Sequence, residues 1–320
     1  MKAKLIVAAA ALSLAPLVAG AQQYPVKPVR VVIPWPPGGS NDVVGRIITQ
    51  KLSETMGQQF IVDNRGGASG VIGAESVAKS PPDGYTLMIH SATHVSNPHL
   101  YAKVPYDTLK DFAAVAPLSV QIGMLVVHPA LPAKSVKEFI ALAKSKPGQL
   151  TYSSSGNGSF VHLSMALFAS MAGIKMTHVP YKGGGPAAIS IASGETQAQM
   201  GTVGSVIQQV KQNRVRALAV TSDKRVDAFP NLPTISEAGV PGYEFTAWIG
   251  MLAPAGTPKP IIDRLNAEVN KILKMPDVAQ NLKSQTLEPL IMTPDQFARR
   301  LKSDYEKYEK VVKLTGAKID

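Results

Sequence analysis

Two loops rich in glycine and serine carry the residue types best suited to binding an anion. Residues 34–42 read PWPPGGSND and follow the apolar run 29–33, and residues 153–159 read SSSGNGS and follow the run 150–153. Each loop leads into a segment whose apolar residues recur at helical spacing. The free N–H groups at a helix start carry a partial positive charge, so both loops are expected to bind a phosphate or a carboxylate.

Two more segments take the same place after strand-like runs: residues 91–93, SAT, and residues 181–185, YKGGG. Ligands of open α/β sheets bind beyond the carboxyl ends of the strands, so we expect one cleft lined by all four segments. The alternative is that they are ordinary turns with helix caps. The predicted ligand-binding residues are Trp35, Pro37, Gly38, Gly39, Ser40, Asp42, Ser91, Thr93, Ser153, Ser155, Gly156, Gly158, Ser159 and Thr202.

The common nucleotide and zinc motifs are missing from the sequence. Loop 34–42 lacks the Lys-Ser/Thr pair of a P-loop, and the second loop has Val161 where a dinucleotide motif needs its third glycine. There is no H-E-x-x-H pair, so His90 and His94 are expected to form hydrogen bonds or lie at the surface instead of binding zinc. We predict that the chain uses no metal and no cofactor.

Catalytic signatures are also weak. No G-x-S-x-G elbow is present, and the S-x-x-K match of Ser76 and Lys79 has no companion motif. We therefore predict that the protein is not an enzyme. The alternative is a periplasmic serine hydrolase in which Ser155 or Ser159 works with His162, a residue that could equally orient the second loop or contact the ligand.

Strand-like and helix-like segments alternate along the chain. Strand-like runs are 29–33, 59–62, 85–90, 122–127, 150–153, 175–179, 216–221 and 246–253. Helical spacing is found in 42–56, 70–78, 135–143, 160–171, 186–193, 260–273 and 294–312. This order predicts an α/β fold of two lobes, each with a mixed, mostly parallel sheet flanked by helices.

The two closing helices would pack most naturally on the first lobe, so the chain is expected to cross between lobes twice. The predicted organisation is residues 22–121 in lobe I, 122–246 in lobe II, and 247–320 back in lobe I. The crossings, near 116–123 and 245–251, are candidate hinges.

The N-terminus predicts export. Lys2 and Lys4 precede an apolar run, and Ala19-Gly20-Ala21 is a small-residue cleavage site, so residues 1–21 are expected to be a signal peptide cleaved after Ala21. The 320 residues contain no cysteine, which excludes disulfides and an N-terminal lipid. Removing two lysines lowers the formal charge from +11 to +9, and the basic residues are dispersed. We expect a periplasmic protein that binds no nucleic acid.

Seven stretches of the sequence, in order, resemble the Bug family of periplasmic solute-binding proteins, the receptors of tripartite tricarboxylate transporters. They read YPVKPVRVVIPWPPGGSND, DNRGGASGVIGAESVAKSPPDGYTL, TYSSSGNGSFVHL, HVPYKGGGPA, RALAVTS, PTISEAGVPGYE and WIGMLAPAGTPKP. The resemblance implies a two-lobed Venus flytrap of the type II periplasmic binding-protein kind. It also implies a ligand carboxylate held between the lobes mainly by backbone amides and hydroxyls. Trp35 stands where the family often has phenylalanine.

These observations predict an extracytoplasmic receptor. It would close on a small organic acid and deliver it to the integral membrane components of a tripartite tricarboxylate-type transporter, working as a monomer. Dicarboxylates, tricarboxylates, acidic amino acids and aromatic acids all remain open as ligands. Side chains expected to set specificity are Trp35, Thr93, His94, Thr202 and Ser205.

Overall fold

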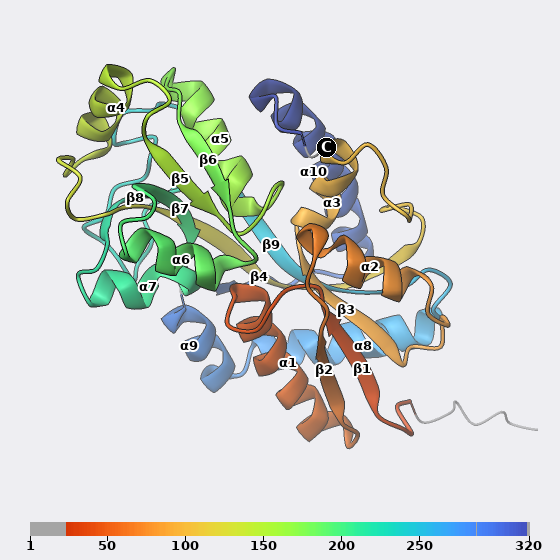
Figure 1. Cartoon of the computed structure of the whole chain (residues 1–320). Helices are drawn as coiled ribbons and strands as arrows, with labels where there is room; N and C mark the ends of the chain where they lie inside the picture. Colours follow the sequence, from red (N-terminus) through yellow and green to blue (C-terminus); the bar gives the residue numbers. More distant parts are fainter. Residues whose placement is uncertain (1–23, 286, 319–320) are drawn as a thin grey trace, which may run out of the picture.

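The computed structural model describes residues 24–285 and 287–318, so the predicted signal peptide, residues 1–21, lies outside the described residues. The strands are β1 (Val29–Ile33), β2 (Phe60–Asn64), β3 (Thr86–Ser91), β4 (Phe112–Val127), β5 (Thr151–Ser154), β6 (Thr177–Pro180), β7 (Ala198–Thr202), β8 (Arg216–Val220), β9 (Thr246–Pro254) and β10 (Glu288–Pro289). They pair in the order β2-β1-β3-β9-β4-β7-β5-β6, and β8 and β10 both pair with β4 (Figure 1).

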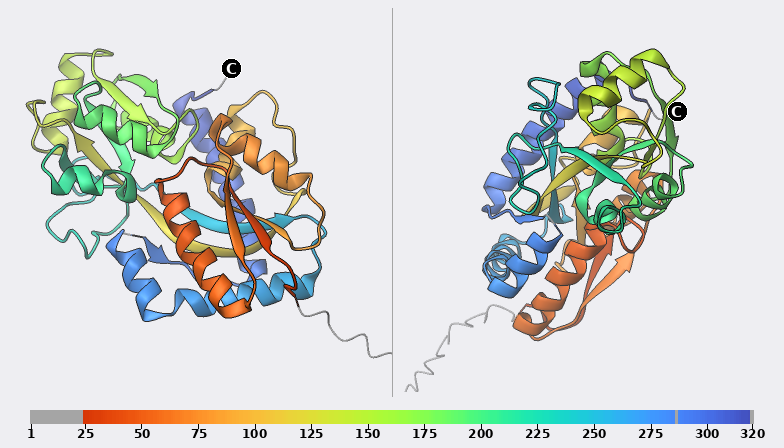
Figure 2. Two further views of the ribbon diagram at one scale, coloured as in Figure 1. Left: turned by 60° about the horizontal axis from the view of Figure 1, so that its bottom comes forward. Right: turned by 90° about the vertical axis from the view of Figure 1, so that its left-hand side faces the viewer.

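Helices cover both faces of these sheets. They are α1 (Ser40–Met56), α2 (Val71–Ala78), α3 (Thr93–Leu100), α4 (Val136–Ser145), α5 (Phe160–Ala172), α6 (Gly184–Ala192), α7 (Val203–Lys211), α8 (Lys259–Leu273), α9 (Pro276–Ser284) and α10 (Pro294–Thr315), with a short 3-10 turn η1 (Ala68–Gly70). Figure 2 shows α1 and α8, which pack on each other, beside the sheet of β1, β2 and β3. No helix in the described part of the chain is both long and apolar enough to span a membrane.

Strand β4 divides the molecule into two halves. Residues 112–122 pair with β9, whereas residues 123–127 pair with β7 and β8. We call β1, β2, β3, β9, α1, α2 and α3 with α8 and α9 the first half, and β5 to β8 with α4 to α7 the second half. The chain passes between them at Ile122–Gly123 and at Phe245–Thr246, where β4 and β9 run side by side (Figure 1).

Both halves contain mixed sheets, as expected for the α/β class. Strand β1 is parallel to β2 and β3, and β5 is parallel to β6 and β7. The antiparallel share is larger than the sequence suggested, because β4 and β9 are antiparallel to each other and to their other neighbours. The prediction missed residues 112–121 of β4. Pro117 argues against a central strand, and the structure accommodates it between two register shifts.

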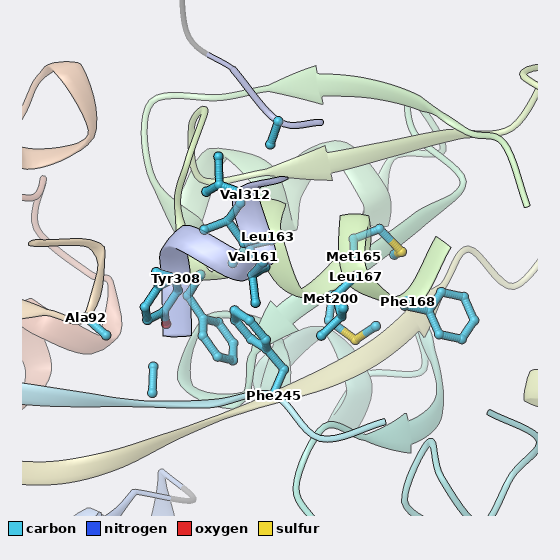
Figure 3. Close-up of a cluster of buried hydrophobic side chains, with 14 of the residues drawn as sticks. Ala92, Val161, Leu163, Met165, Leu167, Phe168, Met200, Phe245, Tyr308 and Val312 are labelled. Atoms are coloured by element: carbon cyan, nitrogen blue, oxygen red, sulfur yellow. The ribbon is translucent and has the colours of Figure 1, made fainter. Parts of the chain in front are cut away.

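Helix α10 contacts elements of both halves. It packs against α3, β4 and α5. Its Tyr308 packs edge to face on Phe245, the last residue before β9, with ring centroids 5.7 Å apart (Figure 3). Phe245 in turn contacts Phe160 of α5. At the other end of α10, the buried ring of Phe297 packs edge to face on Trp248 and covers Gly250 of β9. The crossing strands therefore lie in the hydrophobic core.

Replacing Phe297 with alanine should lower the free energy of unfolding by about 3–5 kcal/mol, because it opens a cavity over β9 that the sheet cannot close. Urea denaturation followed by circular dichroism measures the change. The exposed Lys302→Ala on the same helix is the control, expected within about 0.5 kcal/mol of the parent protein. A Phe297→Ala variant as stable as this control would contradict the packing described.

Candidate ligand-binding cavity

A cavity with an empty volume of about 490 Å³, its mouth included, lies between the two halves. Its walls come from the loop between β1 and α1, the start of α3, strand β4, and the loops before α5, α6 and α7. The lining residues are Trp35, Pro36, Pro37, Gly39, Ser40, Asn41, Ser91, Thr93, Gln121, Ser155, Ser159, Phe160, Val161, Gly183, Gly184, Gly185 and Thr202.

Five helices begin at this cavity. Gly39 caps α1, Ser159 caps α5, Gly183 caps α6 and Thr202 caps α7, while Thr93 is the first residue of α3. Each helix start carries the equivalent of roughly half a positive charge and up to four free N–H groups. None of the described residues that line the cavity has a charged side chain. The cavity is therefore positive in potential and neutral in composition, which suits an organic anion.

Asp42 supports the first loop from behind instead of lining the cavity. Its buried carboxylate accepts hydrogen bonds from the Gly38 N–H, the Arg46 Nε and the Asn64 Nδ2, all at 3.0–3.1 Å. Asn64 also donates to the Trp35 carbonyl at 3.0 Å. Burial alone would raise the pKa of Asp42, but the hydrogen bonds from Arg46, Gly38 and Asn64 bring it below its ordinary value. An ionised Asp42 thus fixes the loop that presents the α1 amides.

Two stacked histidines support the second loop. His162 Nδ1 accepts a hydrogen bond from the Gly158 N–H at 2.9 Å, and His178 Nε2 lies 2.6 Å from the Ser154 hydroxyl. The two imidazole rings are parallel, with centroids 4.0 Å apart. Gly158 has a φ of +71°, a conformation that favours glycine. The rings set the backbone path that directs the α5 amides into the cavity.

The serine hydrolase alternative lacks its catalytic pair. The His162 ring nitrogen that could act as a base already accepts from Gly158, and the Ser159 hydroxyl oxygen accepts from the His162 backbone N–H. Within the described chain, no hydrogen bond joins a serine hydroxyl to the His162 ring. Burial also lowers the pKa of His162 to about 3, which makes it a poor base.

A second histidine pair lies behind Trp35. His90 Nδ1 accepts from the Trp35 indole N–H at 3.3 Å and from the Ser91 N–H at 2.8 Å, and His94 Nε2 lies 3.2 Å from the Thr108 carbonyl. Trp35 is buried and forms one wall of the cavity. The residues around His94 form helix α3, where the sequence had suggested a loop. No cluster of metal-ligating side chains occurs in residues 24–285 and 287–318.

Nine of the fourteen predicted site residues line the cavity, namely Trp35, Pro37, Gly39, Ser40, Ser91, Thr93, Ser155, Ser159 and Thr202. Gly38 and Asp42 are hydrogen-bonded to each other behind it, and Ser153 donates to the Ala187 carbonyl. Gly158 bonds to His162, and Gly156 lines an adjoining pocket with Ser69 and Tyr181.

The prediction omitted two amide side chains that line the cavity, Asn41 and Gln121. Asn41 lies in the sequence between Ser40 and Asp42, which were both predicted site residues, so its position in the loop could have identified it. Gln121 follows Pro117 on the part of β4 that was not predicted as a strand, so no sequence pattern placed it near a ligand. Pro36, Phe160 and Val161 were also absent from the fourteen residues. So were the glycines 183–185, although their segment, residues 181–185, was expected to line the cleft and does so.

Side chains join the two halves across the cavity. The Ser40 hydroxyl donates to Thr202 Oγ1 at 3.0 Å, and the Ser96 hydroxyl donates to the Gly158 carbonyl at 3.2 Å. The Ser69 hydroxyl also donates to the Asn157 carbonyl. These contacts correspond to a closed arrangement of the two halves.

The buried histidines make stability depend on pH. Burial lowers the pKa of His162 to about 3 and of His94 and His178 to about 4, and it lowers the pKa of His90 well below its ordinary value. The unfolded chain binds these protons near pH 6.5, so the free energy of unfolding should fall as pH decreases from about 6.5 toward 4.

The slope should reach about 1.4 kcal/mol per pH unit for each such histidine, measured by urea denaturation at pH 7, 6 and 5. His178→Gln, which removes one of the four, should show a shallower dependence. Equal stability of the parent protein at pH 7 and pH 5 would contradict neutral, buried imidazoles.

Comparison with known proteins identifies the chain's relatives. The family model described as "Tripartite tricarboxylate transporter family receptor" matches residues 44–317. The protein BugT of Bordetella pertussis is 35% identical over 301 residues, 93% of this chain and 92% of BugT.

Solved structures agree with this relationship. R. palustris Rpa4515 with adipate has a TM-score of 0.90 at 37% identity and covers 92% of this chain and 100% of its own. MatC from Rhodopseudomonas palustris with bound malate has a TM-score of 0.85 at 32% identity and covers 90% of this chain and 100% of its own. The fold, the cavity between two halves and these matches together show that the chain belongs to the tripartite tricarboxylate transporter receptor family, whose members are solute-binding receptors and not enzymes.

Proposed function

We propose that this protein captures a small organic carboxylate in the cavity between its halves and delivers it to the membrane components of a tripartite tricarboxylate-type transporter. The observation that carries the proposal is the convergence of five helix starts on a cavity whose described lining residues carry no charged side chain. The adipate and malate bound by the two R. palustris relatives support a carboxylate as the ligand class.

A carboxylate in this cavity would be held by first-turn amides of α1, α5 and α6 and by free hydroxyls. The Ser159 hydroxyl accepts from the His162 N–H and keeps its own proton for a ligand. Because no described lining residue is charged, binding of the carboxylate would depend on several hydrogen bonds, which can break together when the hinge opens. Micromolar affinity corresponds to about 8 kcal/mol, which several charge-assisted hydrogen bonds plus burial can supply.

We infer that residues 22–121 and 247–320 move as one lobe and residues 122–246 as the other. In the part of the chain that the structure describes, two backbone crossings join the lobes, at Ile122–Gly123 and Phe245–Thr246. The hydrogen bonds of Ser40 with Thr202 and of Ser96 with Gly158 would form on closure. A ligand held from both sides would shift the equilibrium toward this closed form.

A receptor that delivers a solute to such a transporter works in the periplasm, so the proposed function requires this protein to be exported. Residues 1–21 would direct the chain to the periplasm and be cleaved after Ala21, and the mature protein would work there as a monomer. Native mass spectrometry of the protein isolated from a bacterial periplasm tests both points through the mass of the chain and of any complex. A retained N-terminus or a stable dimer would contradict this part of the proposal.

Gly39→Val should abolish carboxylate binding and leave the fold intact. Gly39 has a φ of −85°, which valine can adopt, and a Cβ added there meets no atom within 4 Å. The new side chain would therefore occupy the cavity that Gly39 lines. Calorimetry with a panel of di-, tri- and aromatic carboxylates should give a binding acid for the parent protein and at least a 100-fold weaker Kd for the variant.

The exposed Gln50→Val on the same helix is the matched control, with unchanged affinity expected. Cooperative thermal unfolding of both variants shows that they are folded. Parent-like affinity of Gly39→Val would place the ligand elsewhere, and the absence of any binding acid across the panel would contradict the proposed function.

A further inference from the structure

The second half of the molecule carries more than half of the positive charge left after removal of the predicted signal peptide. Residues 123–245 contain 11 lysines and arginines against 6 aspartates and glutamates, which gives a formal charge of +5 out of +9. These cations are dispersed along the sequence. Whether they form a surface that attracts anions depends on where the fold places them.

The starts of β5, β6, β7 and β8 lie together at one edge of the second half. Val127, the last residue of β4, pairs with Ala198 and Arg216, the first residues of β7 and β8. Ala198 also pairs with Tyr152 of β5, and β5 and β6 are in register from their first residues. The loops at the opposite strand ends line the cavity, so this edge lies away from it.

Helix α4 and the turns into β5 and β6 bring four lysines to this edge. Lys137 and Lys144 lie two turns apart on the exposed face of α4, which connects β4 to β5, and Lys146 follows in the loop. In that loop the Gly148 N–H donates to the carbonyl of Lys175, just before β6, at 2.9 Å. Figure 1 shows α4 at the outer end of the second half.

Three more basic residues reach the edge from the other strands. Lys211 ends α7, a helix that begins at the cavity, and Arg214 follows just before β8. Arg216 of β8 donates to the carbonyl of Ala133 at 3.0 Å, which places Lys134 beside it. We call the following seven exposed residues the basic edge: Lys134, Lys137, Lys144, Lys146, Lys175, Lys211 and Arg214.

The charge of the basic edge is largely uncompensated. None of its seven side chains forms an ion pair with another described residue. The segments that build it, residues 128–150, 173–176, 193–197 and 211–215, contain two acidic residues, Glu138 and Glu195. Seven cations against two carboxylates leave an excess of five positive charges, which requires an anionic partner to be neutralised.

The composition of the basic edge favours a lipid surface over an acidic protein. Six of its seven cations are lysines, whereas ion pairs of fixed geometry between proteins are better made by arginine. Met171, in the last turn of α5, is 40% exposed at the same end of the molecule. Lysines combined with an exposed apolar side chain are typical of surfaces that bind the headgroup layer of a membrane.

We propose that the basic edge binds the anionic phospholipid headgroups of the membrane and so holds the receptor at the surface where its transporter lies. The choice of a membrane as the partner rests on the proposed function, which ends at a membrane transporter. An anionic lipid surface repels a free carboxylate and attracts a receptor with a basic edge. Because the edge lies away from the cavity, lipid binding leaves the cavity uncovered.

Co-sedimentation with lipid vesicles tests the proposal. At about 50 mM salt the parent protein should bind vesicles of equal parts phosphatidylglycerol and phosphatidylcholine at least about 10-fold more tightly than pure phosphatidylcholine vesicles, and about 500 mM salt should release it. A variant of the basic edge should lose at least about 10-fold in affinity for the anionic vesicles. Its four substitutions are Lys144→Gln, Lys146→Gln, Lys175→Gln and Lys211→Gln.

The matched control removes the same charge from other parts of the surface. Its four exposed lysines, which also form no ion pair with a described residue, are replaced as Lys103→Gln, Lys274→Gln, Lys302→Gln and Lys310→Gln. The control should bind the anionic vesicles within about 2-fold of the parent protein. Both variants should keep the parent's circular dichroism spectrum, because all eight side chains are exposed.

Three results would overturn the proposal. The first is equal binding of the two kinds of vesicle by the parent protein. The second is an equal loss in the variant and the control, because net charge alone would then explain it. The third is binding to polyglutamate without binding to anionic vesicles, which would assign the basic edge to an acidic protein. Vesicle binding needs no carboxylate ligand, so these results are independent of the calorimetry that tests the proposed function.

Discussion

The candidate ligand site depends on backbone N–H groups at the starts of several helices, which surround one cavity lined by uncharged residues. Helices α1, α5, α6 and α7 and the start of α3 surround the cavity, and no described side chain that lines it is charged. A charged side chain would hold an anion through one strong contact. Amide groups spread the interaction over two halves of the molecule, so the complete site exists only when those halves approach each other.

The charged and titratable side chains next to the cavity do not line it; they contact the loops and side chains that do. Asp42 fixes the first loop through Gly38 and Asn64, while His162 fixes the second through Gly158 and stacks on His178. His90 likewise positions Trp35 by accepting a hydrogen bond from its indole N–H. Each of these groups acts through its hydrogen-bond geometry on the backbone or side chains that meet the ligand. Burial also lowers the pKa of His90, His162 and His178, as it does that of His94, so these four imidazoles are expected to be neutral near pH 7.

Local patterns predicted the elements that carry the loops. The β-branched run 29–33 and the capped, periodic segment 160–171 correspond to β1 and α5. What the sequence could not predict depends on tertiary structure. The first part of β4 contains Pro117, which the strand accommodates only through its register shifts against β9. Consequently Gln121, whose place in the cavity depends on that strand, had no local signal. Asp42 was assigned to the ligand from its place in the first loop. Its i,i+4 spacing to Arg46 on α1 was a local signal for an ion pair, whereas nothing in the sequence indicated Asn64 of β2 as a partner.

The central claim is that peptide nitrogens from both halves meet on one carboxylate. A titration followed by ¹⁵N–¹H NMR spectra, with an organic acid that calorimetry shows to bind, tests it most directly. The account predicts that the amide resonances of Asn41, Val161 and Gly184, in the first turns of α1, α5 and α6, shift together and most strongly. Saturable binding that leaves these three resonances unchanged would contradict it.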